Sequence, residues 1–163
     1  MRKKTRIDPP LYLASTTISC WRCGADMPVV GLIGSQRARS GGQVCTPSDI
    51  TELPDVVLSF IQKRFPTFKR KFSKTTRSEY LANTCPKCGM ISGDFYLHSE
   101  PGGSFFPTTK QEAQRLTLEL MSAQYSIEVR AGFGMGTGDL ILKSGKRRSA
   151  EQGSAGEPGA PDV

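Results

Sequence analysis

The alternation of apolar and polar residues predicts a β-hairpin near the start of the chain. Thr, Ile and Leu are frequent over residues 11–19 and alternate in part with polar residues, which is typical of a strand. An apolar run over residues 27–33 is expected to form the returning strand, with Pro28 at a sheet edge or at the strand start. The turn between these strands contains Cys20 and Cys23. We therefore expect a hairpin with both cysteines at its tip.

A second hairpin with the same organisation is predicted in the middle of the chain. Residues 75–84 have a strand-like composition and lead into a turn that contains Cys85 and Cys88. Residues 90–98 are expected to form the outgoing strand, in which the Gly93-Asp94 pair indicates a bulge. The two cysteine pairs are thus expected on the tips of two separate hairpins.

Helical spacing of apolar residues occurs in two segments. Over residues 54–64 the apolar residues recur at helical intervals, and Pro54 suits the first helical position. Over residues 109–124, Thr109 and Glu112 match a capping box, which predicts the start of a second helix. The apolar face of this second helix is expected to consist of Ala113, Leu116, Leu120 and Ala123.

The connecting and terminal segments are predicted to be mostly irregular. Residues 1–10 are basic and without periodicity, so a flexible arm is expected. Residues 34–46 are polar and Gly-rich, which indicates a loop, although residues 43–45 could extend a strand. Residues 125–130 alternate and could pair as an edge strand, whereas Gly, Ser, Lys, Arg and Pro dominate residues 132–163 and predict a disordered tail.

Length and composition fit one small domain with tails. The 163-residue chain has 37% hydrophobic residues with 17 Gly and 11 Pro, so much of it is expected to be irregular. We expect one domain over residues 11–131. No run approaches the roughly 20 apolar residues of a membrane span, and no apolar signal core follows the basic first residues. These features predict a cytoplasmic protein without a membrane partner, and no small-molecule substrate is evident.

The net charge of +7 is concentrated in one segment. Residues 63–77 contain seven basic residues and no acidic residue, so this segment alone equals the excess of the whole chain. A local charge of this kind attracts polyanions, although runs of charge are more often solvated surfaces. The seven residues are Lys63, Arg64, Lys69, Arg70, Lys71, Lys74 and Arg77.

Aromatic residues are interleaved with these cations, which allows two interpretations. Cations that follow a phosphate backbone, combined with rings such as Phe65, Phe68 and Phe72 that stack on bases, are typical of proteins that bind single-stranded nucleic acid. The alternative is that Phe60, Phe65 and Phe68 pack beneath the first helix while the cations are merely solvated. We expect at least two of the Phe side chains to be core residues.

The most specific motif is C-x-x-C-G, which occurs twice and which we call a knuckle. In each knuckle the turn directs two sulfurs at one point, and the Gly allows the left-handed backbone conformation. Two knuckles supply four thiolates, which predicts one structural zinc ion with no open coordination position. Arg22 and Lys87, each just before the second Cys of a pair, would offset part of the −2 charge of a zinc tetrathiolate. The expected ligands are Cys20, Cys23, Cys85 and Cys88.

The distance between the knuckles departs from that of a compact zinc ribbon. There are 61 residues between Cys23 and Cys85, compared with roughly 15–20 in a compact ribbon, so an inserted loop and helix must fill the gap. The alternative is two unrelated reduced thiol pairs. A thioredoxin-like site does not fit, because Gly24 and a strand follow the first pair where a helix should begin. Cys45 is expected to be a bystander thiol and His98 a structural residue.

The knuckles resemble those of zinc-ribbon proteins. The run Tyr-Leu-Ala-Asn-Thr-Cys-Pro-Lys-Cys-Gly over residues 80–89, with its continuation through residues 93–95 and 101–107, resembles small bacterial zinc-ribbon proteins without an assigned activity. The resemblance covers about residues 15–107 and implies zinc ligation by the four Cys. It implies no sharper function, because zinc ribbons serve nucleic-acid machinery, protein docking and structural reinforcement alike.

Together these features predict an α+β zinc-ribbon domain. Two knuckle hairpins share one zinc ion, one helix lies in the insertion, and a C-terminal helix packs on a small antiparallel sheet. The expected function is non-enzymatic binding of nucleic acid through the basic segment of residues 63–77. The alternative is a protein-docking adaptor in which Phe105 and Phe106 contact a partner. An enzyme is not expected, because four thiolates leave no coordination position for water or substrate.

Overall fold

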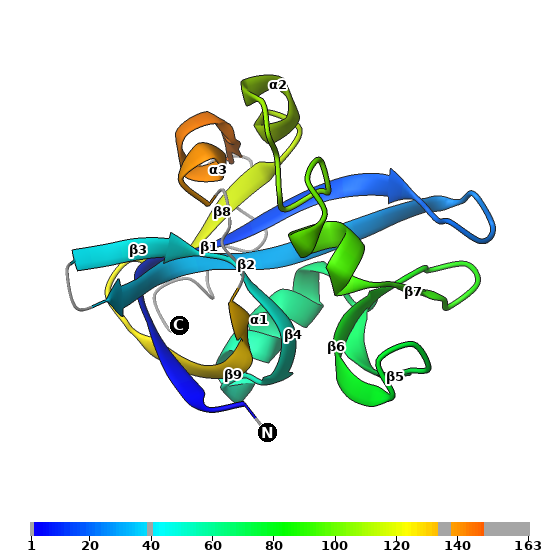
Figure 1. The fold of residues 1–163 in the computed structure, drawn as a ribbon, viewed down its shortest axis with the longest axis horizontal. Coiled ribbons are helices and arrows are strands. Elements are labelled where there is room, and N and C mark those ends of the chain that lie inside the picture. Colours follow the sequence, from blue (N-terminus) through cyan, green and yellow to red (C-terminus); the bar gives the residue numbers. More distant parts are fainter. Residues whose placement is uncertain (1, 39–40, 134–137, 149–163) are drawn as a thin grey trace.

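The fold is organised around β1 (Lys4–Ser19), a 16-residue strand that pairs along both of its edges. The computed structural model describes residues 2–38, 41–133 and 138–148. Along one edge β1 is antiparallel to β2 (Asp26–Ala38), and the two strands form the predicted first hairpin. Along the other edge β1 pairs first with β9 and then with β8 (Figure 1).

The change of partner along β1 coincides with two prolines. Pairing with β9 (Ile127–Phe133) ends at Ile7, and pairing with β8 (Thr117–Ser122) begins at Leu11. Pro9 and Pro10 lie between these points. Proline has no backbone N–H to donate, and here neither β8 nor β9 requires one from β1. β1 can therefore contribute to two parts of one curved sheet.

The described residues form two sheets and a few short helices, so the fold is α+β and consists mostly of sheet. The larger sheet has seven strands, with β10-β8-β1-β2-β3 in order and β9 joining β1 to β4. The smaller sheet has the order β5-β6-β7. The remaining elements are β3 (Gly41–Cys45), β4 (Pro47–Glu52), α1 (Asp55–Arg64), β5 (Phe68–Ser73), β6 (Ser78–Thr84), β7 (Ile91–Ser92), the π-helical turn η1 (Phe95–Ser99), α2 (Lys110–Ala113), α3 (Gly138–Ser144) and β10 (Lys146–Arg147).

Hydrophobic cores cover both faces of the β1–β2 hairpin. Val30 and Leu32 of β2 point into a core with α1, whereas Val29 and Ile33 point into a second core with Leu116 and α3. Successive side chains of a strand point to opposite faces, so a strand covered on both sides is apolar at every position. This explains the unbroken apolar run of β2. Figure 1 shows α1 on one side of the hairpin and α2 and α3 on the other.

The second helix predicted from the sequence is wrong beyond its first turn. The capping box is confirmed, since the Glu112 N–H donates to Thr109 Oγ1 at 3.1 Å, but α2 ends at Ala113. The chain then forms β8, which takes its hydrogen bonds from β1. Leu120, which was expected on the buried face of the helix, is 46% exposed, whereas Leu118 and Met121 are buried in the second core and in the α1 core respectively.

Three segments expected to be irregular contain strands or helix. The arm of residues 1–10 is part of β1 from Lys4 onward, and the loop of residues 34–46 consists largely of the end of β2 and all of β3. In the expected tail of residues 132–163, β9 continues to Phe133 and α3 and β10 follow, while residues 149–163 lie outside the described part. Neighbouring strands supply hydrogen bonds that local sequence does not reveal.

Two predictions are confirmed, and two others are corrected in part. The 54–64 helix is α1, and the strand before the second knuckle is β6, which confirms both. The strand predicted for residues 125–130 is β9, but it has partners on both sides and is not an edge strand. The strand predicted for residues 90–98 ends at Ser92, because η1 turns Leu97 and His98 into the core.

Candidate metal centre

Both knuckles are closed by the same two backbone hydrogen bonds. In the first knuckle, the Gly24 N–H donates to the Cys20 carbonyl at 2.9 Å and the Cys20 N–H donates to the Ala25 carbonyl at 2.8 Å. The second knuckle repeats both bonds at 2.9 Å. Gly24 and Gly89 have φ values of 75° and 77°, a conformation that other residues adopt only with strain. The C-x-x-C-G motif thus folds the same turn twice.

Backbone N–H groups of each turn point at the first sulfur of the pair. The Arg22 N–H lies 3.4 Å from Cys20 Sγ, and the Lys87 N–H lies 3.4 Å from Cys85 Sγ. Hydrogen bonds from the Cys23 and Arg22 backbones lower the pKa of Cys20 to about 6. The backbone N–H groups of Cys88 and Lys87 likewise lower the pKa of Cys85. Each turn therefore favours the thiolate of its first cysteine, which is the form that binds metals, whereas the neighbouring Cys side chains raise the pKa of Cys88.

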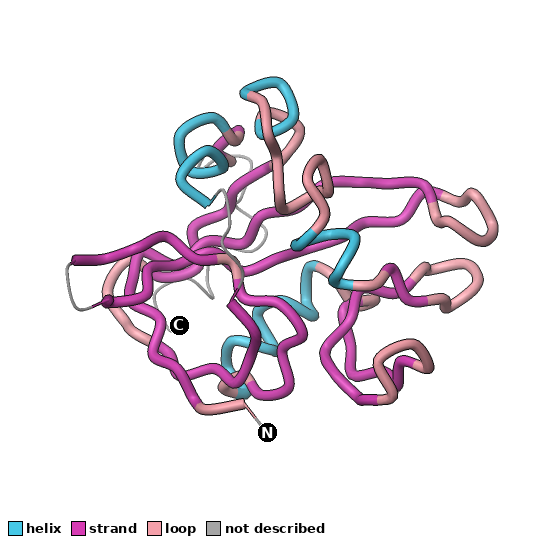
Figure 2. The backbone as a smooth tube through the Cα atoms, in the orientation of Figure 1, coloured by secondary structure: helices cyan, strands magenta, loops and turns pink. Residues whose placement is uncertain are grey.

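The four predicted ligands converge on one point. Their sulfurs all lie within 4.8 Å of one another, and two cross-knuckle pairs, Cys20 with Cys88 and Cys23 with Cys85, are each 3.6 Å apart. A zinc ion with four sulfurs at about 2.3 Å requires separations of about 3.8 Å. The four thiols therefore fit one tetrahedral metal ion, and the predicted convergence of the two knuckles is confirmed. Figure 2 shows the two knuckle loops at the same end of the molecule.

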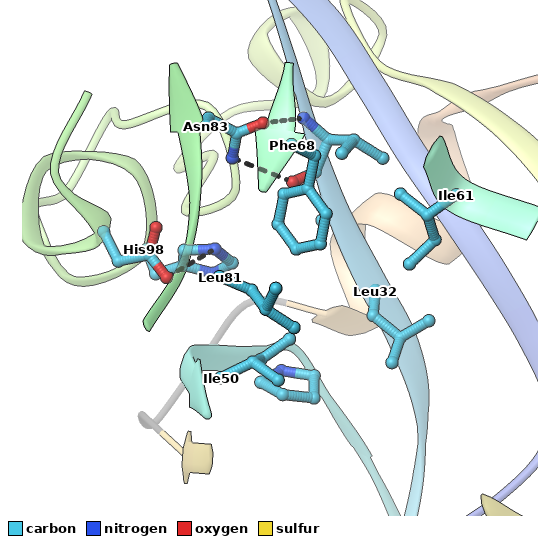
Figure 3. A pocket seen from close by; sticks show the side chains of 11 residues that line it. Leu32, Ile50, Ile61, Phe68, Leu81, Asn83 and His98 are labelled. Atoms are coloured by element: carbon cyan, nitrogen blue, oxygen red, sulfur yellow. Dashed lines mark hydrogen bonds and ion pairs between the residues drawn. The ribbon is translucent and has the colours of Figure 1, made fainter. Parts of the chain in front are cut away.

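A buried amide holds the two hairpins together. Asn83 Oδ1 accepts from the Val30 N–H at 2.9 Å, and Asn83 Nδ2 donates to the Val30 carbonyl at 3.1 Å (Figure 3). Asn83 lies on β6, two residues before Cys85, and Val30 lies on β2 of the larger sheet. This pair of bonds bridges 53 positions of sequence and places the second knuckle against the first. Sequence reasoning did not assign a role to Asn83.

Trp21 makes a direct contact between the knuckles. Its Nε1–H donates to the Ile91 carbonyl at 2.8 Å, and Arg22 Nη1 lies 3.6 Å from Met90 Sδ. Trp21 is nevertheless 67% exposed. Sequence reasoning missed this residue, although its position as the only Trp, between two metal-ligand candidates, is the signal that could have identified it.

The seven basic residues of the 63–77 segment do not form one equivalent group. Arg64 packs over the Phe60 ring and forms a 2.7 Å ion pair with Glu119, so it has a structural role. Arg70 donates to the Thr51 carbonyl at 3.1 Å and lies 4.0 Å from Glu79. The other five are exposed and have no ion pair with any residue in the described part of the chain. These five are Lys63, Lys69, Lys71, Lys74 and Arg77.

The Phe residues of this region divide in the same way. Phe60 and Phe68 are buried in the α1 core and Phe65 packs partly against it, which confirms the expectation of at least two core residues. Phe72 on β5 is 57% exposed. Phe105, which the adaptor interpretation placed at a partner surface, is only 1% exposed and Phe106 is half-buried.

Cys45 lies apart from the metal-ligand cluster. Its side chain is buried in the α1 core, and that burial raises the pKa of the thiol to about 11. A protonated thiol in an apolar environment is a poor nucleophile and a poor ligand. This agrees with the expectation of a bystander.

His98 and Asp94 lie on the wall of a small cavity of about 10 Å³ between the two sheets (Figure 3). Asp94 Oδ2 accepts from the Asp49 N–H at 2.7 Å and lies 4.0 Å from His98 Nε2. Burial raises the pKa of Asp94 to about 7 and lowers the pKa of His98 to about 4, because a low-dielectric environment disfavours both charged forms. His98 is not part of the sulfur cluster, which agrees with a structural role.

Replacing Asp94 by Asn is expected to stabilise the protein increasingly as the pH rises from about 4 to 7. The Asp94 carboxyl ionises near 3.8 in the unfolded chain and near 7 in the folded protein, so the wild type loses stability over this interval. The largest slope is about 1.4 kcal/mol per pH unit. Asn keeps the oxygen that accepts from the Asp49 N–H and does not ionise.

Urea unfolding of both proteins between pH 4.5 and 7.5 measures this effect. His98 contributes with the opposite sign, since its lowered pKa costs stability as the pH falls below 6.5, but it is present in both proteins and cancels in the difference. A difference in unfolding free energy that is constant over this pH range would contradict the prediction.

In comparisons with known proteins, no family model, curated protein or solved structure matches the chain. The resemblance to zinc-ribbon proteins therefore rests on the four cysteines and their geometry. None of the described helices combines the length and apolarity needed to cross a membrane. The function must be argued from the site itself.

Proposed function

We propose that this protein is a non-enzymatic zinc-ribbon module that binds nucleic acid. The supporting observation for zinc is the donor set, since four thiolates in tetrahedral reach of one point suit zinc better than a hard cation. Such an ion would be structural, because Cys20, Cys23, Cys85 and Cys88 fill all four positions. It would hold the β1–β2 hairpin and the β6–β7 hairpin in one orientation.

The observation that favours nucleic acid is the position of the exposed cations. Lys69, Lys71, Lys74 and Arg77 lie on β5 and on the turn to β6, on the same side of the molecule as the knuckles (Figure 1). Lys71 reaches the second knuckle, since a Cβ on Gly89 would lie 4.0 Å from its Nζ. Exposed cations without acidic partners are those that can contact phosphates. Arg64 and Arg70 are left out of this surface because their guanidinium groups are engaged within the protein.

The adaptor alternative has less support. Its proposed anchor, Phe105, packs against the His98 ring with 4.9 Å between ring centroids and lies within the second core. Contact with a partner would require that core to open. The exposed cations, in contrast, need no rearrangement to contact a polyanion.

Changing Lys69, Lys71 and Lys74 together to Ala is expected to weaken binding to a 12-nucleotide oligonucleotide by tenfold or more at about 50 mM salt. Each phosphate contact contributes about −0.7 to the slope of log affinity against log salt for single strands. The wild type is therefore expected to show a slope steeper by about 2 than that of the variant. Fluorescence anisotropy between 50 and 200 mM salt measures both quantities.

The matched control changes Lys110, Arg115 and Lys143 to Ala. These residues are exposed on or near α2 and α3 and remove the same charge from another part of the surface. They are expected to change the affinity and the slope little. Equal losses in the two variants would show that only net charge matters, and no binding by the wild type at 50 mM salt would refute the proposed function.

A further inference from the structure

Trp21 is exposed but held in a fixed orientation, an unusual combination at a loop tip. Two thirds of its surface faces solvent, and its indole N–H is bonded to the Ile91 carbonyl of the other knuckle at 2.8 Å. A large aromatic surface in water is unfavourable, so a free side chain would gain by folding back onto the protein. The hydrogen bond instead keeps the ring at the tip, where its orientation is set by both knuckles.

Cations lie on or beside the same two knuckles as this ring. Arg22 follows Trp21 in the chain and is exposed, with its guanidinium 3.6 Å from Met90 Sδ. Lys71 Nζ would lie 4.0 Å from a Cβ on Gly89, and Gly89 lies two residues before Ile91, whose carbonyl accepts from the indole. The exposed Lys87 completes the set, and neither knuckle contains an acidic side chain over residues 20–25 or 85–90.

These cations are more than the metal centre requires. The zinc tetrathiolate of the proposed site carries a charge of −2, whereas Arg22 and Lys87 within the knuckles and Lys71 beside Gly89 supply three positive charges. Asp26, exposed directly after the first knuckle, is the nearest acidic residue in the sequence, so the three cations outnumber the acidic side chains at the tip. An exposed ring with an oriented face, bordered by positive charge, matches the chemistry of a nucleotide, which has a flat base and an anionic phosphate.

We propose that Trp21 is a stacking platform for an unpaired base, with Arg22, Lys71 and Lys87 contacting the adjoining phosphates. This inference rests on the proposed function and narrows its ligand to single-stranded nucleic acid. The reason is that a base inside a duplex presents no free face to a side chain, whereas every unpaired base does. Stacking is tolerant of sequence, so little preference among bases is expected.

The single Trp makes the test direct, because all indole fluorescence of the chain comes from this ring. The full chain loaded with zinc is titrated with a 12-nucleotide oligothymidylate, with a duplex of the same length and with an abasic 12-mer that keeps every phosphate. The oligothymidylate is expected to quench the fluorescence and to bind about tenfold to hundredfold more tightly than the abasic strand. The duplex and the abasic strand are expected to leave the fluorescence nearly unchanged.

Variants of Trp21 distinguish stacking on a base from a purely structural role of this side chain. The change Trp21→Ala is expected to reduce the affinity for oligothymidylate to that for the abasic strand, and Trp21→Phe to restore part of the loss. Tyr125→Ala removes a ring of similar exposure, 54%, in the turn before β9 and is expected to leave affinity unchanged. Zinc content and circular dichroism of each variant establish that the fold is intact.

The outcomes distinguish this inference from the function on which it rests. Equal binding of oligothymidylate and abasic strand by the wild type, or unchanged affinity in Trp21→Ala, would overturn the stacking role and leave phosphate binding in place. Indole quenching that persists with the duplex would also overturn it. Absence of binding to all three ligands at 50 mM salt would instead refute the proposed function.

Discussion

Removing the metal is expected to unfold the β5–β7 sheet and to lower the free energy of unfolding by on the order of 10 kcal/mol. This loss is comparable to the whole stability of a domain of this size. The physical reason is that four thiol groups within 4.8 Å of one another gain nothing from proximity without a cation, and Cys20 and Cys85 already favour the charged form. Metal analysis of the purified protein is expected to give one zinc per chain, and treatment with a strong chelator is expected to release it.

A pair of variants distinguishes the loss of a metal ligand from the loss of a thiol elsewhere in the protein. Cys85→Ser removes one of the four ligands and is expected to abolish tight zinc binding. Cys45→Ala removes a buried thiol that lies outside the cluster and is expected to cost only about 1 kcal/mol while retaining the metal. A metal-free preparation as stable as the loaded protein, or full zinc binding by Cys85→Ser, would show that the four sulfurs do not form the site.

Replacing Asn83 by Ala is expected to destabilise the protein by about 2–6 kcal/mol, the second largest effect. The change removes both hydrogen bonds to Val30 and leaves a buried N–H and a buried carbonyl without partners, at about 1–3 kcal/mol each. Because Asn83 joins β6 to β2, we also expect the second knuckle to move more freely. Denaturant unfolding measures the first effect, and the rate of zinc transfer to a chromogenic chelator measures the second.

Thr84→Val provides the comparison for Asn83. It removes the 2.6 Å hydrogen bond from Thr84 Oγ1 to the Thr67 carbonyl, at a neighbouring buried position, without touching the link between the two sheets. A loss of about 1 kcal/mol with an unchanged rate of zinc transfer is expected. If both variants release zinc equally fast, the Asn83 link does not position the knuckle.

The parts of the fold predicted correctly are those that local chemistry decides. The helix over residues 54–64 has its apolar spacing and its basic last turn in one short segment, and Pro54, expected at the first helical position, is the residue just before α1. The strands before and after the first knuckle are apolar enough to be recognised without partners. The capping box at Thr109 is equally local, and it forms as expected even though the helix after it does not continue.

The parts predicted wrongly are those whose hydrogen bonds come from distant strands. Residues 117–122 have spacing compatible with a helix, but β1 offers them a ladder of backbone bonds, and two separate cores receive Met121 and Leu118. Lys4 to Ile7 have little apolar character and are a strand because β9 pairs with them. No window of sequence contains this information, since the partners are more than 100 positions away.

The sequence by itself determined the four candidate metal ligands of this protein, because C-x-x-C-G specifies its own turn and the identity of its donors. Only the tertiary structure decided which cations are free to contact a ligand and which aromatic ring is exposed. Arg64 is withdrawn from the basic segment by Glu119, whereas Trp21 and Lys71 are brought to the second knuckle from distant strands. The physical reason is that ligand chemistry belongs to residue types, whereas exposure and pairing depend on what the folded chain places beside each side chain.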